Sequence, residues 1–188
     1  MQESIEKIPP QNVEAEIAVL GSMLLDHDAI SQAVEILNAD YFYKDSHRKI
    51  FSAMLRLFDD NKAIDIITVM EELKKTNSLD EAGGPAYISG LASAVPTTAN
   101  FTHYAKIVKE KMLLRSLITT ATQIVTECYD TTQEADTLVD KAEQRIFDVT
   151  SKKVESRFVS LREVIKDSIE TIDGLYQRKE NVTGIATG

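Results

Sequence analysis

The sequence has little of the chemistry on which disulfide-bonded, secreted or membrane proteins depend. It holds one cysteine in 188 residues, which excludes an internal disulfide. That residue, Cys128, falls on an apolar helical stripe, which predicts a buried structural thiol. No run of about 18 apolar residues occurs. The opening MQESIEKIPPQ lacks the basic and apolar regions of a signal peptide, so we expect a cytoplasmic protein with no membrane span.

Motifs that bind phosphate or activate a nucleophile are missing as well. There is no GxxxxGK[ST] phosphate loop, and the adjacent glycines Gly83 and Gly84 have no lysine placed to meet a phosphate. The three histidines are dispersed, without HExxH spacing and without a neighbouring cysteine. We therefore expect no catalytic residue, no cofactor-binding residue and no metal ligand in this chain.

The remaining polar candidates have ordinary structural explanations. His47 lies beside Arg48 on what we expect to be the outer side of a core helix, so it is predicted to be a surface or capping group. The acids Glu14 and Glu16 lie at a helix start, where carboxylates suit the helix dipole and remain solvated.

Charge is distributed unevenly along the chain. Residues 1–97 hold 8 basic and 16 acidic side chains, a net charge of −8, whereas residues 151–188 are close to neutral. A protein that grips nucleic acid needs clustered cations to displace the counterions of the phosphates. The nearest candidate cluster is spread over more than one helical face, so we expect a solvated surface there. It consists of Lys106, Lys109, Lys111 and Arg115.

The longest continuous pattern lies in residues 98–151. Apolar side chains recur every three or four positions, and no Gly or Pro interrupts residues 98–130, which predicts a helix of roughly 46 Å that Thr97 or Thr98 can cap. After a polar turn at 130–133, a second amphipathic pattern begins at Ala135. The two helices are expected to fold back as an antiparallel hairpin.

Two helices bury only the seam between them. Leu113, Leu117 and Phe147 fall partly outside that seam, so we expect a second hairpin, from another subunit, to cover them. The alternative is that residues 1–97 pack on this surface instead, although they can cover only part of so long a helix pair.

Residues 1–97 are expected to form a small head of short helices, which makes the predicted fold all-α. Residues 64–69 alone are also compatible with a strand because β-branched side chains dominate there, but the following Met-Glu-Glu-Leu favours a helix. The helices are expected to begin near Asn12, near Asp28, at a cap on Asp45 or Ser46, near Asp65, and after the turn Gly83-Gly84-Pro85.

Residues 152–188 are expected to be a linker that carries one more helix. Ser160 and Glu163 form a capping-box pattern, and an apolar stripe follows over residues 160–176. This stripe has no obvious partner in the head, so we expect it to dock on another surface. It consists of Leu161, Ile165, Ile172 and Leu175.

Several stretches resemble one protein family. They are IPPQNVEAEIAVLGSMLLD, DYFYKDSHRKIFSAMLRL, EAGGPAYISGLASAVPTTANFTHYAKIVKEKMLLRSLI and the closing TGIATG, and they span nearly the whole chain. They are similar to the N-terminal half of bacterial DnaB-type replicative DNA helicases. Family members normally read Gly-Ile-Pro-Thr-Gly where this chain has Ala186, and a RecA-like motor that carries the phosphate loop would follow.

The resemblance implies a hexameric, ATP-dependent helicase that moves 5′ to 3′ on single-stranded DNA at the replication fork. ATP and Mg would bind in the motor domain, and the assembled ring rather than this chain would hold the DNA. The N-terminal domains would form a collar of hairpin-paired dimers that recruits primase, and a helicase loader is a further partner left open. The linker helix would dock on the motor of the neighbouring subunit.

Within this family the primase contact lies on the head and the hairpin, and the matching positions are Glu14, Tyr87, Ile118 and Ile124. Each also has an ordinary explanation as a helix-start acid or a packing residue. A second function class also stays open, a free-standing helical adaptor or loader-type protein without a motor. A phosphate loop within about 30 residues after Gly188 in the parent gene would distinguish the two.

Overall fold

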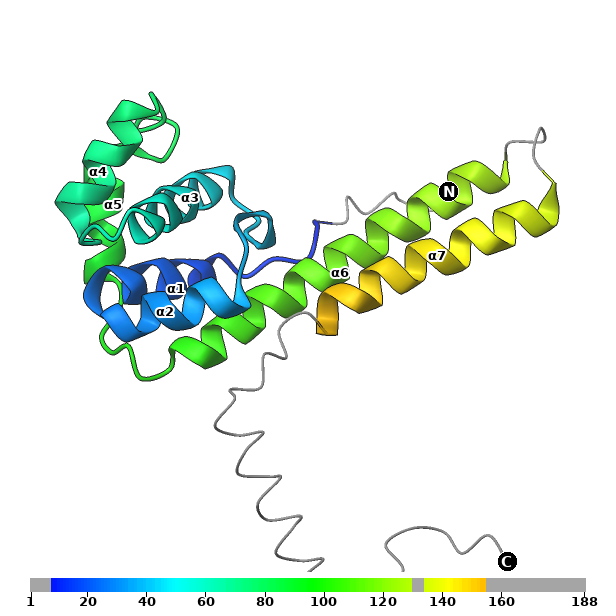
Figure 1. Ribbon diagram of the computed structural model, residues 1–188, viewed down its shortest axis with the longest axis horizontal. Helices are drawn as coiled ribbons and strands as arrows, with labels where there is room; N and C mark the ends of the chain where they lie inside the picture. The colour runs from blue at the N-terminus through cyan, green and yellow to red at the C-terminus, as the bar shows by residue number, and fades with distance from the viewer. Residues whose placement is uncertain (1–7, 130–133, 155–188) are drawn as a thin grey trace, which may run out of the picture. The chain divides into compact units, whose positions relative to one another are not determined.

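The computed structural model describes residues 8–129 and 134–154, and all regular structure in those residues is helical (Figure 1). This confirms the expected all-α class. The expected linker helix at 160–176 lies outside the described residues. The elements are α1 (Val13–Leu25), α2 (His27–Ile36), the short 3₁₀ helix η1 (Ala39–Tyr41), α3 (Asp45–Asp59), α4 (Ile66–Lys75), α5 (Gly84–Ser93), α6 (Phe101–Cys128) and α7 (Ala135–Val154).

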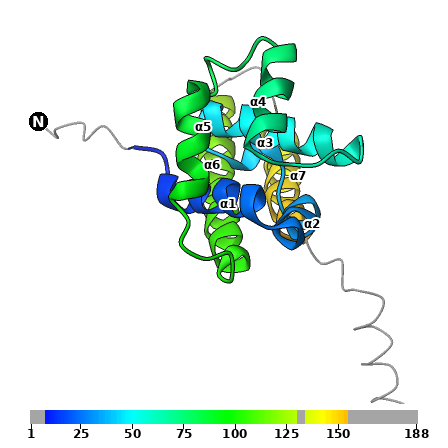
Figure 2. The ribbon, with the colours of Figure 1, turned by 90° about the vertical axis from the view of Figure 1, so that its left-hand side faces the viewer.

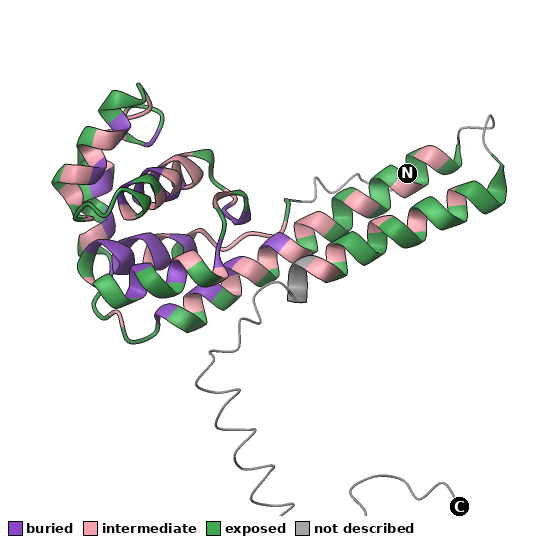
Figure 3. Cartoon of the chain, viewed as in Figure 1, coloured by how far each residue is buried: buried purple, intermediate pink, exposed green. Residues whose placement is uncertain are grey.

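Helix α1 is the centre of the head. Its residues 19–24 are all buried, because α2, α3, α5 and α6 pack around this helix (Figure 2). The side chain of Asn12 accepts a hydrogen bond from the Ala15 N–H at 2.9 Å, which confirms the expected start of α1. Buried residues are concentrated in this part of the chain and become rare along the hairpin (Figure 3).

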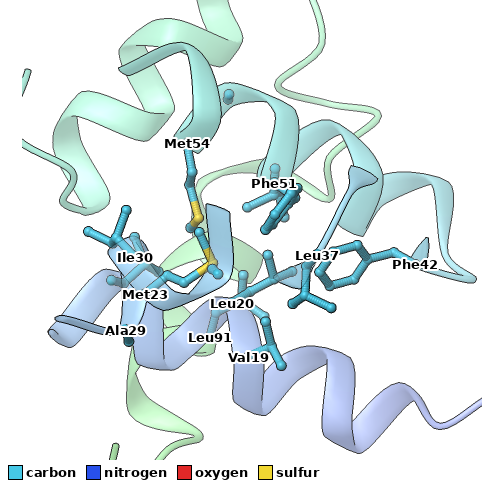
Figure 4. Packing of buried hydrophobic residues seen from close by; sticks show 14 of the residues in the cluster. Val19, Leu20, Met23, Ala29, Ile30, Leu37, Phe42, Phe51, Met54 and Leu91 are labelled. Atoms are coloured by element: carbon cyan, nitrogen blue, oxygen red, sulfur yellow. The ribbon is translucent and has the colours of Figure 1, made fainter. Parts of the chain in front are cut away.

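Two aromatic residues, one just before α3 and one within it, lie in the interior of the head. Phe42 and Phe51 are fully buried, and their ring centroids are 5.0 Å apart. Figure 4 shows Met23 of α1 and Met54 of α3 in the same cluster. The head therefore has one apolar core that every one of its helices helps to build.

Gly21 allows α1 and α5 to approach each other closely. A Cβ atom at this position would overlap the carbonyl oxygen of Leu91 and would lie 2.5 Å from Cγ2 of Val95. Since real Cβ contacts are not that short, only glycine fits this crossing without a shift of one helix.

Two helix starts differ in how well the sequence predicts them. Asp65 caps α4 in a reciprocal capping box with Thr68, which confirms a helix rather than a strand at this position. The expected caps of α6 are wrong. This helix begins at Phe101 after Asn100, whose side chain makes no capping bond, and the Thr98 hydroxyl instead donates to the Asp26 carboxylate at 2.9 Å.

Helix α6 belongs to both the head and the hairpin. Its first part buries Phe101, Ala105, Val108 and Met112 against the head, and its later part runs beside α7 (Figure 1). Helix α7 continues to Val154, beyond the boundary at residue 151 that the sequence suggested. The two helices are joined by side-chain contacts from Arg145, which donates to Gln123 at 3.0 Å and to Glu127 at 2.5 Å.

The expectation of a buried thiol is wrong. Cys128 is exposed at the end of α6. The apolar stripe continues beyond the part of the helix that the head covers, so a position on the stripe no longer implies burial there.

Candidate functional site

The four residues expected to contact primase are divided between the head and the hairpin. Glu14 is exposed in the first turn of α1, and Tyr87 is half-buried on α5. Ile118 is 52% exposed and Ile124 is half-buried, and both lie in the part of α6 that runs beside α7. The ordinary explanation as core packing therefore does not apply to Ile118.

Glu14 lies at the edge of a small pocket between α1 and α6. The pocket has a volume of about 310 Å³, and its lining includes Ala18, Pro96, Tyr104 and Ile107. A cavity with small and apolar walls and one carboxylate at its edge can accept an apolar side chain next to a cation.

A buried chain of polar contacts joins three helices of the head. The carboxylate of Glu16 on α1 lies 2.6 Å from Nδ1 of His47 on α3, and Nε2 of His47 lies 2.6 Å from the phenol oxygen of Tyr87 on α5. Glu16 is 1% exposed and His47 is 0% exposed. Because an ionised carboxylate only accepts hydrogen bonds, Nδ1 donates to Glu16, and Nε2 of a neutral imidazole accepts the proton of the phenol.

The same carboxylate completes the start of α3. It accepts the backbone N–H groups of Tyr43 at 2.6 Å and of Lys44 at 3.4 Å. Lys44 is the N-cap residue of α3 and makes no side-chain capping bond, so the carboxylate from α1 holds the backbone that leads into the helix. This corrects the expectation that Asp45 or Ser46 caps the helix.

The phenol of Tyr87 is a hydrogen-bond donor to the imidazole of His47. Burial raises the pKa of Tyr87, and the negative charge of Glu16 raises this pKa further. The raised pKa keeps the proton on the phenol, so Tyr87 donates to the imidazole. The contacts therefore hold Tyr87 in place.

Both expectations for the buried pair, a solvated Glu16 and a surface His47, are wrong. The helical period contained the signal that would have placed them correctly. Glu16 precedes Val19 and Leu20 by three and four positions, and His47 stands in the same relation to Ile50 and Phe51, so each shares a face with fully buried residues.

Arg115 is a third polar side chain whose role differs from the expected one. Its two amino groups donate to the carbonyl oxygens of Pro10 at 2.8 Å and Tyr41 at 2.5 Å, and its guanidinium lies 5.7 Å from the ring centre of Tyr43. Burial lowers the pKa of Arg115. The expectation of a solvated cation is therefore wrong for Arg115, although Lys106 is exposed as expected.

The residues expected to mediate self-association differ in exposure. Leu117 is 45% exposed and Phe147 is 64% exposed, whereas Leu113 is partly buried against the head core. Leu113 and Leu117, with Leu114 and Val149, line an apolar groove of about 430 Å³ between α6 and α7. The head core thus reaches the start of this surface at Leu113 and leaves the rest open.

Three further expectations concern motor docking, metal ligands and membrane spans, and the structure bears on them only within the described residues. The docking residues Leu161, Ile165, Ile172 and Leu175 lie outside those residues. Within residues 8–129 and 134–154, no group of three or more His, Cys, Asp or Glu side chains is placed to hold a metal ion. None of the helices in these ranges has both the length and the apolar character that crossing a membrane requires.

Comparison with known proteins identifies the family. Residues 8–110, more than half of the chain, match the family model described as the DnaB-like helicase N-terminal domain. The chain belongs to this family. The resemblance inferred from the sequence stretches is thereby confirmed. The match ends within α6, so it includes the whole head and only the beginning of the hairpin.

Solved structures extend the likeness of this DnaB-like domain beyond the head. The N-terminal domain of the DnaB helicase from Mycobacterium tuberculosis is 40% identical, with a TM-score of 0.71, over 76% of this chain and 99% of that chain. A structure described as a DnaB-like replicative helicase and its interactions with primase is 25% identical, with a TM-score of 0.58, over 94% of this chain and 38% of that one.

Curated relatives of the DnaB-like domain are replicative DNA helicases by name. The helicase DnaC of Bacillus subtilis and the helicase DnaB of Geobacillus stearothermophilus are each 44% identical over 97% of this chain. The chain spans 40% of the length of both of these relatives.

Proposed function

We propose that this chain forms the N-terminal collar and linker region of a hexameric, ATP-dependent replicative DNA helicase that moves 5′ to 3′. Its own tasks are ring assembly and the recruitment of primase at the replication fork. The observation that carries the proposal is the 44% identity, over 97% of the chain, to two proteins named as replicative DNA helicases. This identity favours a helicase collar over a free-standing adaptor without a motor.

The exposed apolar surface of the hairpin supports the assembly task. Leu117 and Phe147 remain open to solvent although the head covers Leu113. A second copy of the hairpin would remove these side chains from water and complete a bundle of helices, which is how unpaired helical faces are commonly buried. Pairs formed in this way would be the units of the hexameric ring.

The negative charge of the head and the lack of a phosphate loop in this chain assign DNA and ATP binding to other parts of the helicase. The head carries a net charge of −8, so single-stranded DNA would be held by the assembled ring and not by this chain. ATP and Mg would bind to the motor domain of the parent protein. The linker residues Leu161, Ile165, Ile172 and Leu175 would dock on the motor of a neighbouring subunit.

Primase is the partner for which a related structure offers support, since one similar helicase is described together with its interactions with primase. The contact would involve Glu14 and Tyr87 on the head and Ile118 and Ile124 on the hairpin. A helicase loader would be a further partner of the same collar.

The recruitment task can be tested by measuring how tightly primase from the same organism binds to Ile118→Ala. Ile118 is 52% exposed, and losing a buried anchor at an interface should weaken binding by about tenfold or more. Ile67→Ala is the matched control, because Ile67 is 71% exposed on α4 and is not among the contact residues. Equal binding of both variants and the wild type would contradict the assigned contact, and no binding of primase to the wild type would contradict recruitment itself.

A further inference from the structure

The hairpin has a polar groove that is distinct from its apolar groove. This polar groove has a volume of about 470 Å³ and lies where η1 and α3 of the head meet α6 and α7. Its lining includes Arg48 of α3, Arg115, Thr119 and Thr120 of α6, and Arg145 of α7. None of the residues assigned to primase contact, self-association or motor docking lines it.

Two arginines of the polar groove are oriented by backbone carbonyls and not by carboxylates. Nε of Arg48 donates to the carbonyl oxygen of Phe42 at 2.7 Å, and Arg115 donates to two carbonyl oxygens. Among the described residues, the arginines that form ion pairs are Arg56 and Arg145. A guanidinium has more N–H donors than these contacts use, so Arg48 and Arg115 keep donors for another partner.

The electrostatics of this pair favours an anion. Burial is the main reason that the pKa of Arg115 is lowered; the negative charge of Glu16 opposes this shift, and the positive charge of Arg48 adds to it. Two guanidinium groups that repel each other in a partly buried site are stabilised when a negative group binds between them.

Hydroxyl groups add to the donors of the polar groove. Thr122 and Thr126, on the same helix, donate to the carbonyl oxygens of Ile118 and Thr122 at 2.8 Å each. Thr119 and Thr120 line the groove and make no such bond within the part of the chain that the structure describes. Their hydroxyls can therefore donate to a ligand.

The charge of the lining limits how negative the ligand can be. Asp40 and Asp148 lie in the same groove as the three arginines, and Arg145 is already paired with Glu127, so the charges of Arg48 and Arg115 are balanced by the two acids of the lining. The whole chain carries a net charge of −9, which repels polyanions such as nucleic acid. A carboxylate brings a single negative charge and two oxygens that match the fork of a guanidinium.

We propose that the polar groove binds an acidic side chain presented by a partner protein, with Arg48 and Arg115 as the cationic anchors and Thr119 and Thr120 as additional donors. The partner is a protein segment that presents one Asp or Glu side chain among uncharged residues. The site adds a second docking surface to the collar, and it is independent of the contact assigned to primase.

The test is a titration of the full 188-residue chain with an end-blocked Gly-Gly-Glu-Gly-Gly peptide, which carries a single carboxylate, at constant ionic strength. Nuclear magnetic resonance should show saturable shifts of the Nε–H signals of Arg48 and Arg115 and of the amides of Thr119 and Thr120. Arg48→Gln should weaken peptide binding by about tenfold, because one charge-assisted hydrogen-bonding group is lost. Thr120→Val, which keeps the side-chain shape, should weaken it by a smaller factor.

Matched controls make the outcome decisive. Lys106→Gln removes the same charge from an exposed position of α6 outside the groove and should leave peptide binding unchanged. An equal loss in Lys106→Gln would show nonspecific attraction and overturn the proposal, as would the absence of shifts at the groove. Inorganic phosphate that saturates the same signals more tightly than the peptide would assign the groove to a phosphate ligand and also overturn it.

Discussion

Nδ1 of His47 and the carboxylate of Glu16 lie 2.6 Å apart inside the head, although 31 positions separate the two residues in the sequence. This contact ties α1 to α3, and Nε2 extends it to Tyr87 on α5. A buried polar group is tolerated only when its hydrogen bonds are made, so Glu16, His47 and Tyr87 depend on one another.

His47→Ala should destabilise the head by roughly 2 to 4 kcal/mol, because Glu16 would stay buried without its imidazole partner. Urea unfolding followed by circular dichroism measures the change. His103→Ala is the control, since His103 is exposed, and it should shift the free energy of unfolding by about 0.5 kcal/mol or less. Equal midpoints for the two variants would show that the buried contact contributes nothing.

Tyr87 should make the stability of the head sensitive to alkaline pH. Its pKa is raised in the folded state from the ordinary value of 10.0, so above that pH the unfolded chain loses the proton first and unfolding is favoured. The stability is complete below the ordinary pKa and is lost as the pH rises through the folded pKa. Urea unfolding over roughly pH 9 to 11 should show a steeper fall for the wild type than for Tyr87→Phe, which has no phenol to ionise. An equal fall in stability with pH for the wild type and Tyr87→Phe would contradict the predicted effect of Tyr87.

Gly21→Ala should destabilise the head by about 1 to 3 kcal/mol, since the new methyl group would force α1 away from α5. Gly90→Ala is the matched control on α5, because a Cβ atom there meets nothing within 4 Å. This control should be neutral or stabilising by up to about 1 kcal/mol, as expected for Gly→Ala in a helix. Thermal unfolding compares the two variants, and equal melting temperatures would contradict the close approach at Gly21.

Leu117→Glu should weaken self-association, because it would bury a carboxylate without a partner at a cost of roughly several kcal/mol. Light scattering at high micromolar concentration measures the mass of the particles. Ile67→Glu introduces the same charge at an exposed position of α4 and should associate like the wild type. A wild-type chain that remains monomeric at this concentration would refute the pairing of hairpins.

Local signals in the sequence were sufficient to predict the helices. Asn12 and Asp65 cap α1 and α4 with side chains that lie within three residues of their targets, so a short stretch of sequence contains all of the information. The period of three and four likewise predicts the pairing of α6 and α7 and most of their length, although not their exact ends.

Contacts between distant segments could not be predicted in the same way. The start of α3 is completed by Glu16, which is 28 positions away from Lys44, and no local pattern announces such an acceptor. The sequence predicts a solvated surface at Arg115 because its partners, Pro10 and Tyr41, become neighbours only when the head folds against α6. The prediction that Cys128 is buried is wrong because a contact is missing there. Nothing in the described residues covers the apolar stripe of α6 so far from the head.

The continuity of α6 has a mechanical consequence. The helix has 28 residues, which gives a length of about 42 Å, and its first turns are locked in the core by Phe101, Ala105 and Met112. A tilt of about 5° at that anchor would displace the far end by roughly 4 Å. A stiff α6 therefore acts as a lever, through which a partner that pulls on the hairpin tip applies torque to α1 and the helices packed around it.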